Sequence, residues 1–166
     1  DVEFINFENF KNENLDSFKK LFFALTDYNQ YNKLKETFNK YNKECINLIS
    51  KKSYLSNSSI LGKNIFINNF ASISINCKIK DNCFINTAAI IEHDTILYEN
   101  VTCAPNSTIL GHCIIGANSF IGAGSIIKEG IKIGKNCIIG ANSFVNKDIK
   151  DNVTVYGSPA KSHKFN

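Results

Sequence analysis

The sequence contains no methionine and no apolar run approaching the ~18 residues of a membrane-spanning helix, and its first 54 residues contain no glycine. Without a methionine, Asp1 is not expected to be the native first residue. The chain also opens without the charged and apolar pattern of a signal sequence, so we expect a soluble, cytoplasmic protein. The absence of glycine excludes a G-x-G-x-x-G phosphate loop from residues 1–54.

Composition indicates one ordinary globular unit, with an appendage at most. The chain has 166 residues, of which 43% are hydrophobic and 20% charged. Its net charge of +4 is mild, and the lysines of the last third are spread out rather than gathered in a block. This distribution predicts no nucleic-acid partner and suits a solvated surface, or alternatively a small phosphorylated ligand nearby.

The front of the chain reads as alternating strand and helix. Leu21–Leu25 is an apolar run of strand length, residues 34, 38 and 41 are apolar or aromatic at helical spacing, and Cys45–Ile49 is a second candidate strand. We therefore predict a partial βαβ subdomain over residues 1–54.

From Leu55 onward the pattern has a period of six. Every sixth residue from Leu55 to Val145 is apolar, sixteen positions in all, and the residue four places later in each hexapeptide is small or apolar. A helix cannot keep every sixth residue on one face, because six residues rotate it by ~600°. The pattern predicts a mainly β fold, a parallel hexapeptide-repeat solenoid of about five triangular coils over residues 55–150, followed by a cap or tail over 151–166.

The same register accounts for most cysteines. Five of the six occupy inward positions, and no C-x-x-C pair exists. We expect buried free thiols rather than disulfides or metal ligands at these five: Cys77, Cys83, Cys103, Cys113 and Cys137.

One hexapeptide carries a histidine between two carboxylates. His93 lies at an outward place of the repeat, flanked by Glu92 and Asp94, and Gly111 occupies the same place one coil later. A carboxylate bonded to one ring nitrogen makes the other a better base. A base beside an exposed backbone N–H suits acyl transfer, whereas a surface histidine without a role is the alternative.

A metal site is not predicted. Zinc needs three or four convergent ligands, whereas His93 and His112 lie on adjacent coils one residue out of register, with no third histidine near. Nucleophilic catalysis by a serine, histidine and aspartate stays open, although no strand-nucleophile-helix elbow is visible.

Three features together resemble the left-handed β-helix sugar acetyltransferases. They are the hexapeptides of residues 55–150, the segment Ile85–Asp94 with its Asn-Thr and Glu-His-Asp residues, and the ending Gly157–Lys161. The branch that is most similar contains the sialic-acid O-acetyltransferases and the nucleotide-sugar 4-amino N-acetyltransferases. The resemblance implies a left-handed solenoid, a homotrimer with active sites between subunits, and acetyl-CoA as the co-substrate.

The resemblance also implies roles for individual residues. His93 would be the general base and Asp94 its orienting partner, with Gly111 and Thr102 at the thioester. Acetyl-CoA would contact Gly122, Ala123, Gly140, Ala141, Pro159 and Lys161, and the acceptor sugar would contact Asn86, Glu92 and Thr26.

The sequence departs from the family at three places. Thr102 replaces a second histidine, Pro105-Asn106 replaces Pro-Gly, and Thr26 stands where the family has a glycine. The first half of the family's N-terminal domain has no counterpart in the chain. Acetyl transfer to the 4-amino group of a nucleotide-linked deoxysugar is the expected function. The alternatives are O-acetylation of a sialic-acid-like or other sugar, and a non-catalytic binding module.

Overall fold

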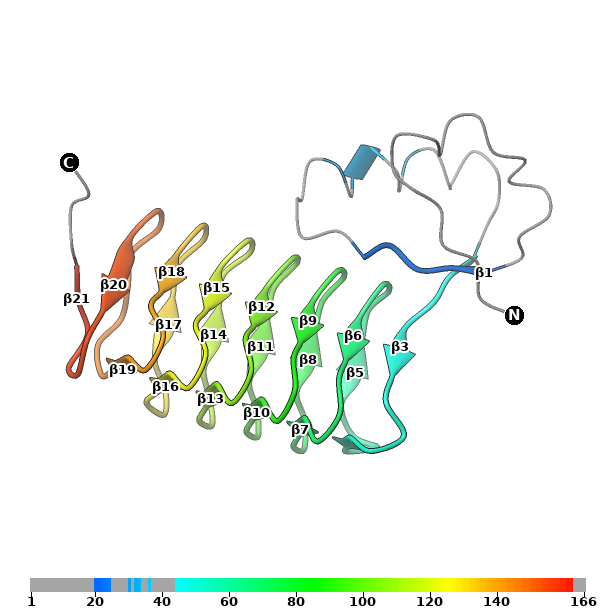
Figure 1. Ribbon diagram of the computed structural model, residues 1–166, viewed down its shortest axis with the longest axis horizontal. Coiled ribbons are helices and arrows are strands. Elements are labelled where there is room, and N and C mark those ends of the chain that lie inside the picture. Colours follow the sequence, from blue (N-terminus) through cyan, green and yellow to red (C-terminus); the bar gives the residue numbers. More distant parts are fainter. Residues whose placement is uncertain (1–19, 25–29, 31, 34–35, 37–43, 163–166) are drawn as a thin grey trace.

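The computed structural model describes residues 20–24, 30, 32–33, 36 and 44–162. It is a left-handed parallel β-helix with three sides, drawn with its long axis horizontal in Figure 1. Nearly all strands are two residues long, and from β3 to β19 each pairs in parallel with a strand 18 residues away, one coil above or below. No helix among the described residues is long and apolar enough to cross a membrane.

Each side of the triangle is one sheet. The first side contains β3 (Leu48–Ile49), β6 (Phe66–Ile67), β9 (Phe84–Ile85), β12 (Thr102–Cys103), β15 (Phe120–Ile121), β18 (Ile138–Ile139), β20 (Thr154–Tyr156) and β21 (Lys161–Ser162). The second side contains β4 (Tyr54–Leu55), β7 (Ser72–Ile73), β10 (Ile90–Ile91), β13 (Thr108–Ile109), β16 (Ile126–Ile127) and β19 (Phe144–Val145). The third side contains β5 (Ile60–Leu61), β8 (Lys78–Ile79), β11 (Ile96–Leu97), β14 (Ile114–Ile115) and β17 (Lys132–Ile133).

The solenoid has about six coils rather than the predicted five. β3 already pairs in register with β6, one hexapeptide before the first residue of the predicted repeat. At the other end β20 pairs with β18 although the period of six has been lost, because Val155 follows Ile139 by 16 residues instead of 18. A slightly shortened coil therefore continues the first side, and the antiparallel β20–β21 pair closes this end.

The inward positions are occupied as the period predicts. Of the sixteen residues at every sixth place, fourteen are buried, and Leu55 and Leu61 at the first coil are partly buried. All six cysteines are free thiols, and the five in the repeat are buried. Burying a large aliphatic side chain contributes about 1.5–3 kcal/mol, so this column of isoleucines is the main stabilising element of the solenoid.

Where glycine follows an inward residue, the coils pack too closely for a side chain. A Cβ on Gly116 would lie 2.5 Å from the backbone carbonyl of Gly134 on the next coil. Glycine at this place therefore marks close packing between coils.

The front segment differs in detail from its prediction. β1 (Lys20–Leu21) pairs in parallel with β2 (Glu44–Cys45), as a βαβ order requires, and residues 30, 32, 33 and 36 are helical. Leu21–Leu25 is not a strand throughout, and Cys45–Ile49 is not one strand: its end belongs to β3 of the solenoid. The side chain of Asn47 causes this break, since it bonds the Ile65 N–H and the Gly62 carbonyl instead of continuing β2. Residues 34, 38 and 41 lie outside the described residues.

A ladder of asparagines runs along the corner between the third and first sides. Each side-chain N–H₂ donates to the amide oxygen one coil further on, over 2.6–3.1 Å. All members have positive φ, a conformation that asparagine tolerates better than most residues. The ladder comprises Asn64, Asn82, Asn100, Asn118, Asn136 and Asn152.

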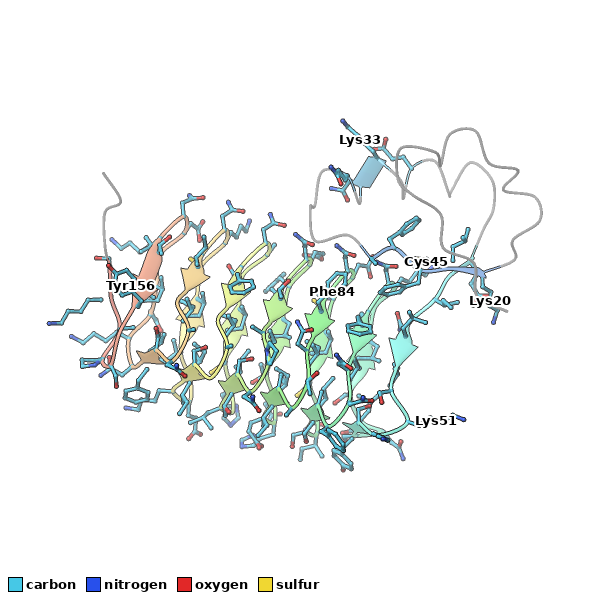
Figure 2. The ribbon with its side chains drawn as sticks, viewed as in Figure 1. Lys20, Lys33, Cys45, Lys51, Phe84 and Tyr156 are labelled. Carbon is cyan, nitrogen blue, oxygen red and sulfur yellow. The ribbon has the colours of Figure 1, made fainter. Side chains whose placement is uncertain are left out.

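The first asparagine of this ladder also holds the front segment. Asn64 accepts a hydrogen bond from the Phe23 N–H at 2.7 Å and donates one to the Phe23 carbonyl at 2.9 Å. Beside it, Phe22 packs against Phe66 and Phe84 on the first side, with ring centroids 6.2 Å apart in both pairs. Figure 2 shows Phe84 on the side of the solenoid that faces this segment.

We predict that Asn82→Gly lowers the free energy of unfolding by about 1–3 kcal/mol, because the buried amides of Asn64 and Asn100 each lose a partner. Asn82→Ala should cost ~1 kcal/mol more, since alanine disfavours the positive φ of 58°. Denaturant midpoints of the two variants measure the difference. If both variants unfolded at the wild-type midpoint, the asparagine ladder would not contribute to stability.

Candidate active site

His93 lies at the corner between the second and third sides, in the turn from β10 to β11. Its side chain points outward, as its place in the repeat predicts, and is 41% exposed. The corner is formed by tight turns whose backbones are hydrogen-bonded from coil to coil. The His93 carbonyl accepts the His112 N–H of the next coil at 2.9 Å. The histidine is thus an exposed side chain on a rigid backbone.

Asp94 is the carboxylate that contacts this histidine. Its Oδ2 lies 3.0 Å from His93 Nδ1, and its Oδ1 accepts a hydrogen bond from Asn76 Nδ2 at 3.3 Å. The hydrogen bond from His93, that from Asn76 and the nearby His112 hold the pKa of Asp94 below its ordinary value. An ionised Asp94 accepts a hydrogen bond from Nδ1–H, so in the neutral imidazole Nε2 is the nitrogen without a proton.

Glu92, the other flanking carboxylate, makes no hydrogen bond or ion pair with the imidazole. Its side chain makes no hydrogen bond or ion pair with any described residue, whereas its backbone carbonyl accepts one from the Cys77 thiol at 3.2 Å. Burial, followed in smaller measure by the charges of Asp94 and Glu92, raises the pKa of Cys77. This cysteine is therefore a protonated, structural thiol.

Gly111 lies directly against the imidazole. A Cβ on Gly111 would be 2.5 Å from Cε1 and 2.7 Å from Nε2 of His93, so only glycine lets the ring lie where it does. The Gly111 carbonyl accepts the Gly130 N–H, but its own N–H donates to no described residue. Gly111 therefore packs against the imidazole, as the register predicts, and its N–H makes no hydrogen bond within the described residues.

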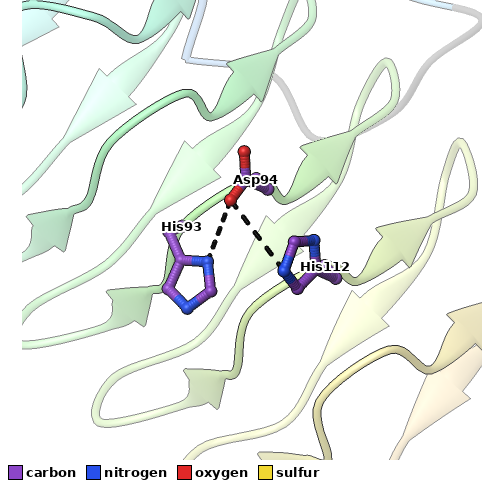
Figure 3. Close-up of side chains that lie close together, drawn as sticks. All are labelled: His93, Asp94 and His112. Carbon is purple, nitrogen blue, oxygen red and sulfur yellow. Dashed lines mark hydrogen bonds and ion pairs between the residues drawn. The ribbon is translucent and has the colours of Figure 1, made fainter.

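His112 is the neighbour that sequence reasoning missed. Its Nε2 lies 4.0 Å from Asp94 Oδ2, and its ring meets that of His93 edge-on with centroids 5.0 Å apart (Figure 3). His112 is one residue out of register with His93, and the carboxylate of Asp94 was not considered as a third ligand in the prediction. Comparison with Asp94, 18 residues earlier, would have placed the two side chains on neighbouring coils.

The remaining predicted residues lie elsewhere on the chain. Asn86, Gly122, Ala123, Gly140 and Ala141 are at the corner between the first and second sides, and Thr102 is on β12 of the first side. Pro159 and Lys161 belong to the β20–β21 end, and Thr26 lies outside the described residues. Asn86 precedes His93 by seven residues, with β10 of the second side between them, and Ala123 and Ala141 lie at the same corner as Asn86 on later coils. The predicted site residues therefore lie at two different corners of the solenoid.

A shallow depression of about 370 Å³ adjoins Asp94 on the third side. It is lined by Ser58, Ile60, Asn76, Lys78, Asp94 and Ile96. Lys78 supplies a cation and Ser58 and Asn76 supply neutral polar groups. Its position beside the histidine makes this depression a candidate place for a polar acceptor molecule.

Comparison with known proteins agrees with the geometry. Residues 112–147 match the family described as bacterial transferase hexapeptide (six repeats), and no curated protein sequence matches the chain. Perosamine N-acetyltransferase of Caulobacter crescentus, solved as a histidine-to-asparagine variant with CoA and GDP-perosamine, is 28% identical, with a TM-score of 0.86 over 90% of this chain and 71% of that one. The chain is similar to hexapeptide-repeat acetyltransferases, and this likeness supports an acetyltransferase activity.

Two further structures extend this likeness. The acetyltransferase domain of PglB from Neisseria gonorrhoeae FA1090, solved with acetyl coenzyme A, is 27% identical, with a TM-score of 0.83 over 90% of this chain and 75% of that one. WeeI of Acinetobacter baumannii AYE, at 24% identity and a TM-score of 0.86 over 96% of this chain and 77% of that one, shares the fold. The chain is thus matched along nearly its whole length.

We predict that Gly111→Ala lowers kcat/KM by about 100-fold or more, because the new methyl displaces the His93 ring and a small misplacement of a catalytic group is costly. Glu129→Ala is the matched control, since residue 129 occupies the same place one coil further on. Both variants should melt like the wild type. Full activity in Gly111→Ala would show that the ring position does not matter.

Proposed function

We propose that the protein transfers the acetyl group of acetyl-CoA to the amino group of a nucleotide-linked deoxysugar, at its 4-position. The contact of His93 with both Asp94 and Gly111 is the observation that carries the proposal. It joins an oriented base to a free amide donor, which are the two groups that direct acyl transfer needs.

In the proposed reaction His93 acts on the acceptor. Nε2 takes a proton from the acceptor amine as the nitrogen attacks the acetyl carbon, a C–N bond forms, and the C–S bond of the thioester breaks. The CoA thiolate leaves and is protonated. Asp94 keeps the proton on Nδ1 and stabilises the imidazolium that forms, which the low pKa of its carboxyl favours.

Gly111 serves the other half of the reaction. Its N–H donates to the thioester carbonyl oxygen as negative charge develops there. Since this amide makes no bond to any described residue, no hydrogen bond of the protein has to break first. Thr102 would assist at the thioester by donating a hydrogen bond, although it lies on the first side of the chain and does not meet His93 within one subunit.

The wide separation of the two corners supports a homotrimer. The pantetheine arm would lie along Gly122, Ala123, Gly140 and Ala141, with Pro159 and Lys161 towards the adenine end. In a three-fold assembly this corner of one subunit can face the His93 corner of the next, which completes a site that a single chain leaves divided.

The acceptor assignment draws on the relatives. The Caulobacter crescentus enzyme is solved with CoA and GDP-perosamine and is named an N-acetyltransferase, which favours an amine on a nucleotide sugar over a hydroxyl. Asn86 would contact this acceptor, and the depression lined by Lys78 would take a polar part of it. Acetyl-CoA and the free thiols of the repeat favour the cytoplasm as the place of reaction.

We predict that thiol release from acetyl-CoA occurs with amino-deoxysugar nucleotides and is at background with hydroxy nucleotide sugars and free sialic acids. His93→Ala should lower the rate by about 10²–10⁴-fold. Turnover only with acceptors that offer a sugar hydroxyl would contradict N-acetylation and favour O-acetylation as the function. Absence of both thiol release and calorimetric acetyl-CoA binding would indicate a binding module instead.

A matched pair of variants tests the orienting carboxylate. We predict that Asp94→Asn lowers kcat by about 10²-fold or more, in the range of a lost base, with little change in the KM for acetyl-CoA. Glu92→Gln should stay close to wild type, since the Glu92 side chain makes no contact with the imidazole. If Glu92→Gln lowered kcat more than Asp94→Asn, the orienting role would belong to Glu92.

A further inference from the structure

Three groups that bind transition metals converge at the His93 corner. One ring nitrogen each of His93 and His112 and a carboxylate oxygen of Asp94 all lie within 4.8 Å of one another. Asp94 Oδ2 is the central atom, 3.0 Å from His93 Nδ1 and 4.0 Å from His112 Nε2 (Figure 3). Ligand atoms around a tetrahedral zinc are ~3.4 Å apart, given bonds of ~2.0–2.1 Å.

Small side-chain rotations would suffice to close this triangle. The three side chains are 41%, 38% and 57% exposed for His93, Asp94 and His112, so their rings and carboxylate can turn without disturbing the core. The backbone beneath is held by the His112 N–H to His93 carbonyl bond of 2.9 Å. Rigid backbone and adjustable side chains are what a metal ion needs to assemble its ligands.

His112 has no other evident task in the fold. Among the described residues it is one of thirteen non-glycine residues with positive φ, of which nine are asparagine. The only ion pair and ring contact that its side chain makes with described residues are those with Asp94 and the His93 ring. The solenoid therefore does not require a histidine at this turn.

We propose that His93, Asp94 and His112 bind one divalent transition-metal ion of the Zn²⁺ type, and that the ion inhibits acetyl transfer. Two imidazoles and one carboxylate suit Zn²⁺ and its neighbours rather than Mg²⁺, and three protein ligands leave a fourth position open. The binding stands on geometry alone, whereas the inhibition rests on the proposed function.

The inhibition follows from the tautomer of His93. With Asp94 ionised and the ring neutral, the 3.0 Å contact requires Nδ1–H to donate a hydrogen bond to Oδ2, which leaves Nε2 with the free lone pair. A metal bound at Nδ1 needs the lone pair of that nitrogen, so the proton moves to Nε2. The same ion removes Asp94 from its orienting role. Metal binding therefore takes away both the base and its partner.

Calorimetric titration with Zn²⁺ tests the site directly. Wild type should bind one ion per chain, and His112→Asn, the residue most often found at such turns, should weaken binding by at least ~100-fold, more than loss of an outer-shell partner does. Glu129→Gln, which removes a carboxylate on the next coil, should bind like wild type, and Mg²⁺ should give no heat. Equal Zn²⁺ affinity in wild type and His112→Asn would contradict the proposed metal site. Binding of Mg²⁺ as tight as that of Zn²⁺ would contradict the proposed preference for transition metals.

Turnover measured with the same proteins tests the inhibition. Zn²⁺ should abolish thiol release by wild type and EDTA should restore it, whereas the turnover of His112→Asn, measured relative to its own metal-free rate, should resist the ion. If Zn²⁺ binds as predicted while turnover is unchanged, the metal site stands and the inhibition is overturned together with the assignment of His93 as base. Matching melting curves exclude misfolding of the variant.

Discussion

The parallel hydrogen bonds between successive coils are the constraint on which the rest of the structure depends. They fix each residue beside its neighbours 18 positions away, as in the pairs Ile90 with Thr108 and Ile96 with Ile114. Side chains at one place of the repeat therefore form columns along the axis. The isoleucine core, the asparagine ladder and the group around His93 are all consequences of this register.

Each column can be used for a different purpose because the backbone geometry hardly varies. Asn76, Asp94 and His112 occupy the same place in the turns of three successive coils. Their φ angles lie between 56° and 58°. The fold accepts an amide, a carboxylate or an imidazole there at little cost. Chemical groups can thus be placed at one coil without redesign of the others, and we propose that the coil of His93 carries the catalytic groups.

Much of the fold follows from the sequence, since a period of six admits few structures. The inward column from Ile67 to Val145 and the buried cysteines are confirmed. The coil count was too low because Ile49 precedes the predicted start and Val155 rejoins the sheet after a coil of 16 residues. The front strands were misjudged because Asn47 bonds backbone groups of the solenoid, a tertiary contact that leaves no local pattern.

The site was partly predictable for the same reason. Register alone places Gly111 beside His93, but the choice of Asp94 over Glu92 depends on a turn with positive φ that directs the aspartate back to the ring. The approach of His112 was within reach of the register and was missed because only histidines were compared. That the predicted residues lie at two different corners becomes apparent only once the chain is placed on the three sides of the fold.

The central proposal for the molecule is that one corner of the solenoid holds the base and the amide that act on a single thioester. A crystal structure of the protein with acetyl-CoA tests this most directly. The thioester carbonyl oxygen should lie about 3 Å from the Gly111 nitrogen, as expected for an N–H···O hydrogen bond, with His93 Nε2 facing the acetyl carbon. Acetyl-CoA bound with its thioester away from this corner would contradict the account.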